Sequence, residues 1–262
     1  MTKPQTTFVG AATDGSRVQF SVDLVLGSHQ TSLSQHRELA RTTHRLLNIF
    51  AQAGIPATWT CAELDSSAVV DALATKPTRH EIALLATPSW AGNNVSRVEF
   101  ARELEERIHD AVENGFTLRT LAMHEVNREA DLDILARHDV RVIRTEGEGR
   151  QARPATIRHG ITRVPVSARI PVASFFDRLA GSFRTRLHVK RLMARDNHVV
   201  LHAADYLEDT HSRLRTLEVF VDEAARAVAE GRCVVENLAE VGQRLRPIRV
   251  AQPSRSILRP AA

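Results

Sequence analysis

Residues 18–23, VQFSVD, form the first strongly apolar run of the chain, and their pattern decides the fold class. Apolar and polar residues alternate in it, which is the period-two pattern of a β-strand with one buried face. The run ends on the carboxylate of Asp23, where the chain enters a polar loop that reaches residue 31. Because sites in parallel α/β folds are built where strands end and loops begin, Asp23 is the first candidate site residue.

After this strand, predicted helices alternate with short predicted strands. Three times a helix ends at a glycine that precedes the next strand, at Gly54, Gly115 and Gly231. This alternation predicts parallel strands joined by right-handed crossovers. Seven or eight mostly parallel strands favour one α/β domain in the form of a closed or nearly closed (β/α) barrel. No Gly-x-Gly-x-x-Gly motif follows a predicted strand, which argues against a dinucleotide-binding fold.

Periodicity, together with start and stop signals, places the individual elements. Capping boxes at Ser32/Gln35 and Ser96/Glu99 predict the starts of two amphipathic helices. The predicted helices cover 32–53, 64–74, 96–114, 130–138, one or two stretches within 175–195, 212–230 and 238–245. The predicted strands cover 18–23, 57–61, 80–85, 117–124, 140–145, 161–166, 198–202 and 233–236.

The composition is that of an ordinary globular protein, with 262 residues, 43% of them hydrophobic and 25% charged. We expect a flexible N-terminus over 1–15, one barrel domain over 16–243 and a flexible Arg-rich tail over 244–262. No apolar run approaches the length of a membrane-spanning helix, and the start has no apolar core of a secretory signal. The expected location is therefore the cytoplasm, where Cys61 and Cys233 would be reduced core thiols.

The net charge of +4 belongs largely to the tail. Five arginines and no acidic residue lie in 244–262, so the remainder of the chain carries a charge of about −1. A nearly neutral folded part does not favour nucleic acid as a partner, and binding through the tail is the weakest of the functional hypotheses.

Polar residues follow several of the predicted strands, and in a barrel they would converge on one face. Asp23, His124 and His202 supply a carboxylate and two imidazoles, which can hold zinc or act as base and acid in hydrolysis. With twelve histidines in the chain, the alternative is that both imidazoles only hydrogen-bond to neighbouring loops. The further candidates from these loops are Trp90, Glu125, Asn127, Glu146 and Asp205.

Trp90 has two interpretations. Its indole could stack on a sugar ring, or it could cover the edge of the core, as loop tryptophans commonly do.

The order of segments resembles the polysaccharide deacetylase, or NodB-homology, family over roughly residues 17–240. The resemblance is carried by the strand ending at Asp23, AGIPATWT at 53–60, HEIAL at 80–84, LARHDVRVI at 135–143 and VVLH at 199–202. It implies a distorted (β/α) barrel that removes acetyl or related acyl groups from carbohydrate or amide nitrogen. It also implies a divalent metal, usually zinc, held by one aspartate and two histidines.

The motifs of that family are only partly present. Of its Thr-Phe-Asp-Asp-Gly motif, residues 20–24 keep Asp23 alone, which the resemblance assigns as a metal ligand. The two metal histidines expected after the third strand are replaced by LATPS at 85–89, and Arg-Pro-Pro-Tyr is replaced by HEVN at 124–127. His202 follows Leu201, as the catalytic histidine of the last motif does.

Two functional hypotheses follow, because zinc needs about three protein ligands and the family pattern keeps too few. In the first, the chain is a catalytically impaired barrel that binds a carbohydrate, a small acylated ligand or a protein partner and needs no cofactor. In the second, it is a metal-dependent hydrolase acting on acyl groups at non-peptide C–N bonds. Its centre would be rebuilt with Asp23 and His124 on the metal, with His202, Asp205 and Glu125 as catalytic groups, and with Trp90, Asn127 and Glu146 contacting substrate.

Overall fold

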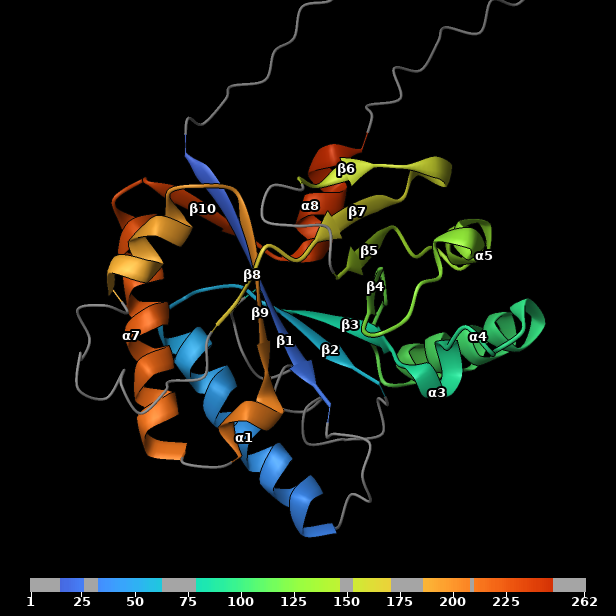
Figure 1. Ribbon diagram of the computed structural model, residues 1–262, viewed down its shortest axis with the longest axis horizontal. Coiled ribbons are helices and arrows are strands. Elements are labelled where there is room, and N and C mark those ends of the chain that lie inside the picture. The colour runs from blue at the N-terminus through green and yellow to red at the C-terminus, as the bar shows by residue number, and fades with distance from the viewer. Residues whose placement is uncertain are drawn as a thin grey trace, which may run out of the picture.

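The computed structural model describes residues 15–25, 33–62, 79–146, 153–170, 186–207 and 210–246, with the backbone alone for residues 33, 210 and 211 (Figure 1). Several predicted features lie outside these ranges. They are the helix at 64–74, the N-cap Ser32, residues 175–185 and most of both terminal segments. The domain boundaries therefore stay predictions.

The described strands form one ten-stranded, mostly parallel sheet. They are β1 (Ser16–Leu24), β2 (Thr58–Cys61), β3 (Glu81–Ala86), β4 (Thr120–Met123), β5 (Val142–Thr145), β6 (Ala155–Thr156), β7 (Thr162–Pro165), β8 (Ala168–Arg169), β9 (Asn197–His202) and β10 (Cys233–Glu236). Their order is β6-β7-β5-β4-β3-β2-β1-β9-β8, with β10 paired to the first half of β1. Only β6 runs antiparallel to its neighbour.

Helices cover the outside of this sheet (Figure 1). They are α1 (Leu33–Gln52), α3 (Pro88–Ala91), α4 (Arg97–Glu113), α5 (Leu132–Arg137), α7 (Thr210–Ala229) and α8 (Leu238–Leu245), with a further helical stretch at 186–193 and short 3₁₀ turns η1 (Glu129–Asp131), η2 (Arg158–Gly160) and η3 (Ala203–Tyr206). The predicted capping box of α4 is confirmed, because Ser96 and Glu99 bond each other's backbone N–H. The glycine after α1 is confirmed as a stop as well, since Gly54 has φ 66°, where a side chain would be strained.

β1 is buried on both faces. Its apolar residues lie under the helices, where the ring of Phe20 meets Phe50 of α1 and Phe220 of α7 edge-on at centroid distances of 5.8 and 5.9 Å. Its polar residues, which include Ser21 and Asp23, point into the barrel and are equally buried. The prediction of a single buried face was therefore wrong, because the polar face lines an interior rather than meeting water.

One extended segment closes the barrel. β7 pairs with β5 near one end of the strand order, and β8 pairs with β9 at the other end, although only residues 166 and 167 separate β7 from β8. Val166 N donates to Thr145 O, and Ser167 N donates to His198 O. Because this segment joins both edges of the curled sheet, the distorted (β/α) barrel is confirmed.

Helix α8 covers the amino ends of the strands. Its residues Leu238 and Val241 pack on Val142 of β5 and Val164 of β7. Gly242 lies so close to β5 that a Cβ there would stand 2.4 Å from the Val142 side chain. At the same end, half-buried Glu81 accepts hydrogen bonds from Thr58 Oγ1 and from Ala239 N of α8, both at 2.9 Å. The opposite, carboxyl ends of the strands carry the predicted site.

Two predictions from composition can be compared with the described residues. Cys61 and Cys233 are both buried free thiols, as predicted, and burial raises the pKa of Cys61 to about 12. Within the ranges given above, no helix is long and apolar enough to cross a membrane.

Candidate functional site

The register of three parallel strands brings the first site residues together. Asp23, near the carboxyl end of β1, lies directly opposite Thr60 on β2 and His202 on β9. Side chains paired in this way point to the same face of a sheet, which here is the barrel interior. The Asp23 side chain is 1% exposed, so its charge must be compensated from within the protein.

Arg144 of β5 supplies that compensation. Its Nη2 donates to Asp23 Oδ2 at 2.8 Å, its Nη1 donates to Asp23 Oδ1, and the guanidinium is fully buried. Thr60 Oγ1 donates to Asp23 Oδ1 as well, at 2.6 Å. On the strands between, the residue paired with Thr60 is Ala83 and the residue paired with Arg144 is Ala122, and both have small side chains. Burial alone would raise the pKa of Asp23, but Arg144 and Thr60 hold it below its usual value.

Sequence reasoning missed Arg144. The signal was an arginine inside the apolar strand VIRT, since an inward-facing arginine in a barrel needs a buried carboxylate.

The two predicted histidines lie next to this ion pair. His202 Nδ1 is 3.5 Å from Asp23 Oδ2, and His124, which follows β4, places its Nδ1 3.1 Å from Glu146 Oε1. The two imidazole rings are tilted by 57° with centroids 5.7 Å apart. Arg169, at the end of β8, contacts the same Glu146 oxygen at 3.2 Å. The structure thus brings together Asp23, His124, Glu146 and His202 from four different strand ends.

The two imidazoles have different proton affinities. The hydrogen bond between His124 and Glu146 raises the pKa of His124 and lowers the pKa of Glu146. Burial lowers the pKa of His202, although the charge of Asp23 opposes that effect. His124 is thus the more readily protonated of the pair.

His198 lies deeper in the barrel than Asp23, where it is paired with Gln19 of β1. Its Nε2 lies 2.7 Å from the hydroxyl of Ser21, and burial together with the charge of Arg144 lowers its pKa to about 3. A neutral imidazole here adds no second positive charge beside Arg144, so the Asp23–Arg144 pair remains balanced.

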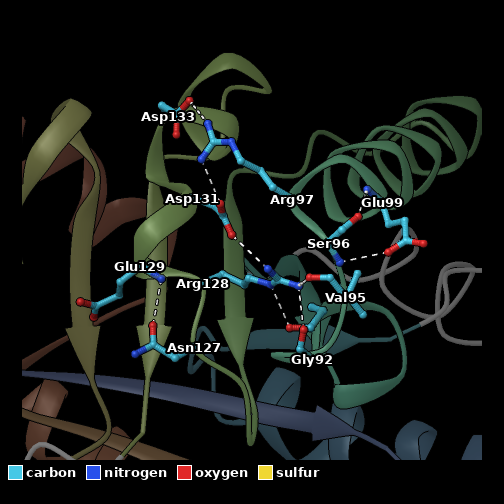
Figure 2. A network of polar contacts seen from close by, with 11 residues as sticks. Gly92, Val95, Ser96, Arg97, Glu99, Asn127, Arg128, Glu129, Asp131 and Asp133 are labelled. Atoms are coloured by element: carbon cyan, nitrogen blue, oxygen red, sulfur yellow. Dashed lines mark hydrogen bonds and ion pairs between the residues drawn. The ribbon is translucent and has the colours of Figure 1, made fainter.

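The remaining predicted residues lie around this centre or away from it. Asp205, in η3, is close enough for its charge to oppose the lowering of the pKa of His202. Glu125 is exposed and has φ 57°, a left-handed conformation that is unfavourable for a residue with a Cβ. Asn127 is exposed, and its Oδ1 accepts a hydrogen bond from Glu129 N, two residues further along, at 2.9 Å (Figure 2).

The surroundings of Trp90 contradict the interpretation that it stacks on a sugar. It is 4% exposed, its ring stacks on Phe100 at 5.8 Å, and the guanidinium of Arg107 lies over the ring at 4.8 Å. Its indole N–H donates to Leu85 O at 3.2 Å. Because the indole is packed into the core, the alternative interpretation, that Trp90 covers the core edge, describes it better.

A buried arginine fixes the loop that carries His124. Arg128 donates to the carbonyls of Ala91, Gly92 and Val95 at 2.7–3.0 Å and to Asp131 at 3.1 Å (Figure 2). It thereby ties the loop after β4 to the turn after β3. His124 N adds a backbone bond to Ala86 O at 3.1 Å. The backbone that carries His124 is therefore hydrogen-bonded to the segment after β3.

Solved structures with the same architecture come from several organisms. A candidate polysaccharide deacetylase from Mycobacterium smegmatis aligns with 96% of this chain and 99% of its own, at 16% identity and a TM-score of 0.65. The chain has the fold of the polysaccharide deacetylases. No protein-family model matches the amino-acid sequence, and no curated protein matches it either.

The deacetylase fold also occurs in proteins that are described differently. A 4-α-glucanotransferase from Thermococcus litoralis aligns with 86% of this chain at 10% identity and a TM-score of 0.63, and the alignment spans 40% of that protein. A protein of Bacillus anthracis described as a CE4 family pseudoenzyme aligns with 88% of this chain and 66% of its own, at 11% identity and a TM-score of 0.53.

The metal implied by the resemblance to deacetylases does not fit the residues that the structure describes. Both oxygens of Asp23 are bonded to Arg144, a permanent cation, and Oδ1 also accepts from Thr60. Among the described residues, no three His, Cys, Asp or Glu side chains are placed to hold one ion. The candidate site is built around an internal ion pair.

Proposed function

We propose that this chain is a carbohydrate-binding barrel that does not carry out metal-dependent deacetylation. The observation that carries the proposal is the buried pair of Arg144 with Asp23. Asp23 is the only aspartate that residues 20–24 retain from the metal motif. The guanidinium of Arg144 bonds both of its oxygens and so occupies lone pairs that a metal would need.

The carboxyl face offers groups suited to a polyhydroxylated ligand. His124, Glu146 and His202 are each 22–23% exposed, and Arg169 is 54% exposed. Imidazole, carboxylate and guanidinium groups bond sugar hydroxyl and amide groups through fixed donors and acceptors. The ligand class that we propose is an N-acylated carbohydrate.

The structural neighbours support both halves of the proposal. Candidate polysaccharide deacetylases share the fold, which favours a carbohydrate ligand, and a CE4 family pseudoenzyme shares it too, which favours loss of catalysis. A mutant of that pseudoenzyme is described as having restored enzymatic activity, so substitution can reverse such a loss in that protein.

The second candidate function is an active metal-dependent hydrolase with a rebuilt centre. The proximity of Asp23, His124 and His202 favours it. It requires a bound cation in the wild-type protein, whereas the first function does not.

The test uses chelator-treated protein and an oligomer of N-acetylglucosamine as the probe. We expect calorimetry to detect binding that is unaffected by chelator, and chromatography to detect no acetate release with or without added zinc. Zinc-dependent acetate release would overturn the proposal in favour of the hydrolase. If the probe does not bind at any accessible concentration, the carbohydrate part of the proposal is wrong.

A matched pair of arginine variants locates the binding. Arg169→Ala removes an exposed ion pair with Glu146 at the carboxyl face, and Arg244→Ala removes an ion pair with Glu236 at the opposite end of the barrel. We expect Arg169→Ala to weaken probe binding roughly tenfold, the effect of losing one charged hydrogen bond, and Arg244→Ala to leave it unchanged.

A further inference from the structure

We infer that the amino end of the barrel, opposite the candidate site, is a basic face that binds the phosphate backbone of double-stranded nucleic acid. In the sequence, the nearly neutral charge of residues 1–243 argues against such a partner. The structure shows that this charge is unevenly distributed. The inference is independent of the proposed sugar binding, which concerns the other end of the barrel.

Arginines recur where the parallel strands begin. One is the second residue of β1, and one stands one or two positions before each of β3, β4, β5, β9 and β10. They are Arg17, Arg79, Arg119, Arg141, Arg195 and Arg232. Because the amino ends of parallel strands meet at one edge of a sheet, these arginines lie around one end of the barrel. Helix α8 covers the same end and adds Arg244, and Arg246 follows it.

Two carboxylates at this end are each shared by two arginines. They are Asp139, which contacts Arg119 at 2.9 Å and Arg141 at 2.6 Å, and Glu236, which contacts Arg17 at 2.6 Å and Arg244 at 3.0 Å. One carboxylate balances one guanidinium, so each group of three keeps a positive charge. Two other pairs are balanced one to one, Arg79 with Glu240 and Arg232 with Glu230. Asp196 and half-buried Glu81 are further acidic residues beside the strand starts.

Three more arginines at this end have no acidic partner in the part of the chain that the structure describes. Arg158 lies in η2 before β7, Arg195 lies before β9, Arg246 follows α8, and all three are exposed. Thr156 Oγ1 donates to Leu245 O at 3.1 Å, so the segments that carry Arg158 and Arg246 are neighbours. With these three, the arginines of this end outnumber its carboxylates, and the face is positive.

The composition of the face favours a duplex over other polyanions. The guanidinium fork bonds two phosphate oxygens at once, which suits it to a phosphate backbone. Within the described ranges no aromatic side chain is exposed, so an unpaired base has no ring to stack on. The exposed large apolar residues of these ranges, Val98, Val112, Leu187 and Val228, form no stripe that could enter a membrane.

The experiment measures binding of a fluorescently labelled DNA duplex of about 20 base pairs to the full chain by anisotropy, between about 50 and 200 mM salt. The face variant is Arg158→Gln/Arg195→Gln/Arg246→Gln, which breaks no ion pair among the described residues. The control is Arg41→Gln/Arg45→Gln/Arg102→Gln, which removes the same charge from exposed positions on α1 and α4. We expect the face variant to bind on the order of tenfold more weakly at low salt, with a slope of log K against log salt smaller by roughly 2–3. The control should stay within about twofold of the wild type.

A second control separates the face from the segment that follows it. Residues 247–262 contain three arginines and no acidic residue. If Arg249→Gln/Arg255→Gln/Arg259→Gln abolishes duplex binding while the face variant binds like the wild type, the inference is wrong.

Three further results would overturn the inference. They are no duplex binding by the wild type, equal loss in the face variant and the α1/α4 control, and binding to phosphatidylserine-containing vesicles without binding to the duplex. The N-acetylglucosamine oligomer should bind equally to the wild type and to both of these triple variants, so failure of the sugar proposal is recognised separately.

Discussion

Breaking the Asp23–Arg144 pair from one side should cost far more stability than removing both partners. Arg144→Met leaves the Asp23 carboxylate buried at 1% exposure with Thr60 as its remaining donor, and Asp23→Leu leaves a fully buried guanidinium uncompensated. Loss of one partner of a buried ion pair costs about 3–5 kcal/mol. Replacing both with apolar residues of similar volume removes both desolvation penalties. The double variant should therefore lie within about 2 kcal/mol of the wild type.

Urea unfolding followed by far-ultraviolet circular dichroism measures these differences, with the four proteins forming a double-mutant cycle. If each single variant loses about 4 kcal/mol and the double variant at most 2, the coupling energy is on the order of 6 kcal/mol. Single variants that lose less than about 1 kcal/mol, or a double variant whose loss is the sum of the two single losses, would show that Arg144 does not compensate Asp23.

Three further predictions concern protonation and the rigidity of the site. Glu146→Gln should bring the raised pKa of His124 back toward 6.5. The wild type gains stability from the protonated His124 below pH 6.5 and loses it as pH rises through the pKa of His124, and the variant should lack this contribution. NMR titration of the imidazole measures the pKa, and an unchanged value refutes the prediction. His198, with a pKa of about 3, takes up its proton mainly on unfolding. As pH falls from 6 to 4, the free energy of unfolding of the wild type should therefore decrease by about 1.4 kcal/mol per pH unit relative to His198→Gln. Parallel stability curves of the two proteins would contradict this. Arg128→Ala removes four largely buried hydrogen bonds, to the carbonyls of Ala91, Gly92 and Val95 and to Asp131, although Val95 N still bonds Gly92 O and Arg97 still bonds Asp131. It should cost about 3 kcal/mol in urea unfolding, and a loss below about 1 kcal/mol would mean that Arg128 does not hold the loop.

Local pattern was sufficient to place the longer described elements and the strand-end carboxylate, but it missed β6, β8 and the short helix α3. The alternation in 18–23 predicted β1, and the end of that run predicted Asp23 as a site residue, both from residues adjacent in the chain. The barrel follows from the repeated alternation of helix and strand. Its closure by one segment spanning β7 and β8 was not predictable, because it depends on pairing with β5 and β9 at opposite edges of the sheet.

The arginine inside VIRT signals that a buried carboxylate is needed, but which carboxylate it pairs with was beyond sequence reasoning for a related reason. Arg144 is 121 positions away from Asp23, and its direction depends on the register of five strands, which no local pattern encodes. Trp90 shows the opposite error, since a tryptophan in a turn-rich loop suggested an exposed stacking surface. Its burial is set by Phe100 and Arg107 of the following helix, whose packing against that loop is a tertiary effect.

The most direct test of the central claim is a calorimetric zinc titration of the chelator-treated wild-type protein, beside His124→Ala and His202→Ala. The account predicts no one-to-one zinc binding that depends on these two histidines. The third ligand would have to be the carboxylate of Asp23, and Arg144 already occupies it. Tight one-to-one binding that both substitutions weaken would contradict it, and the rebuilt metal-dependent hydrolase would then be the better description.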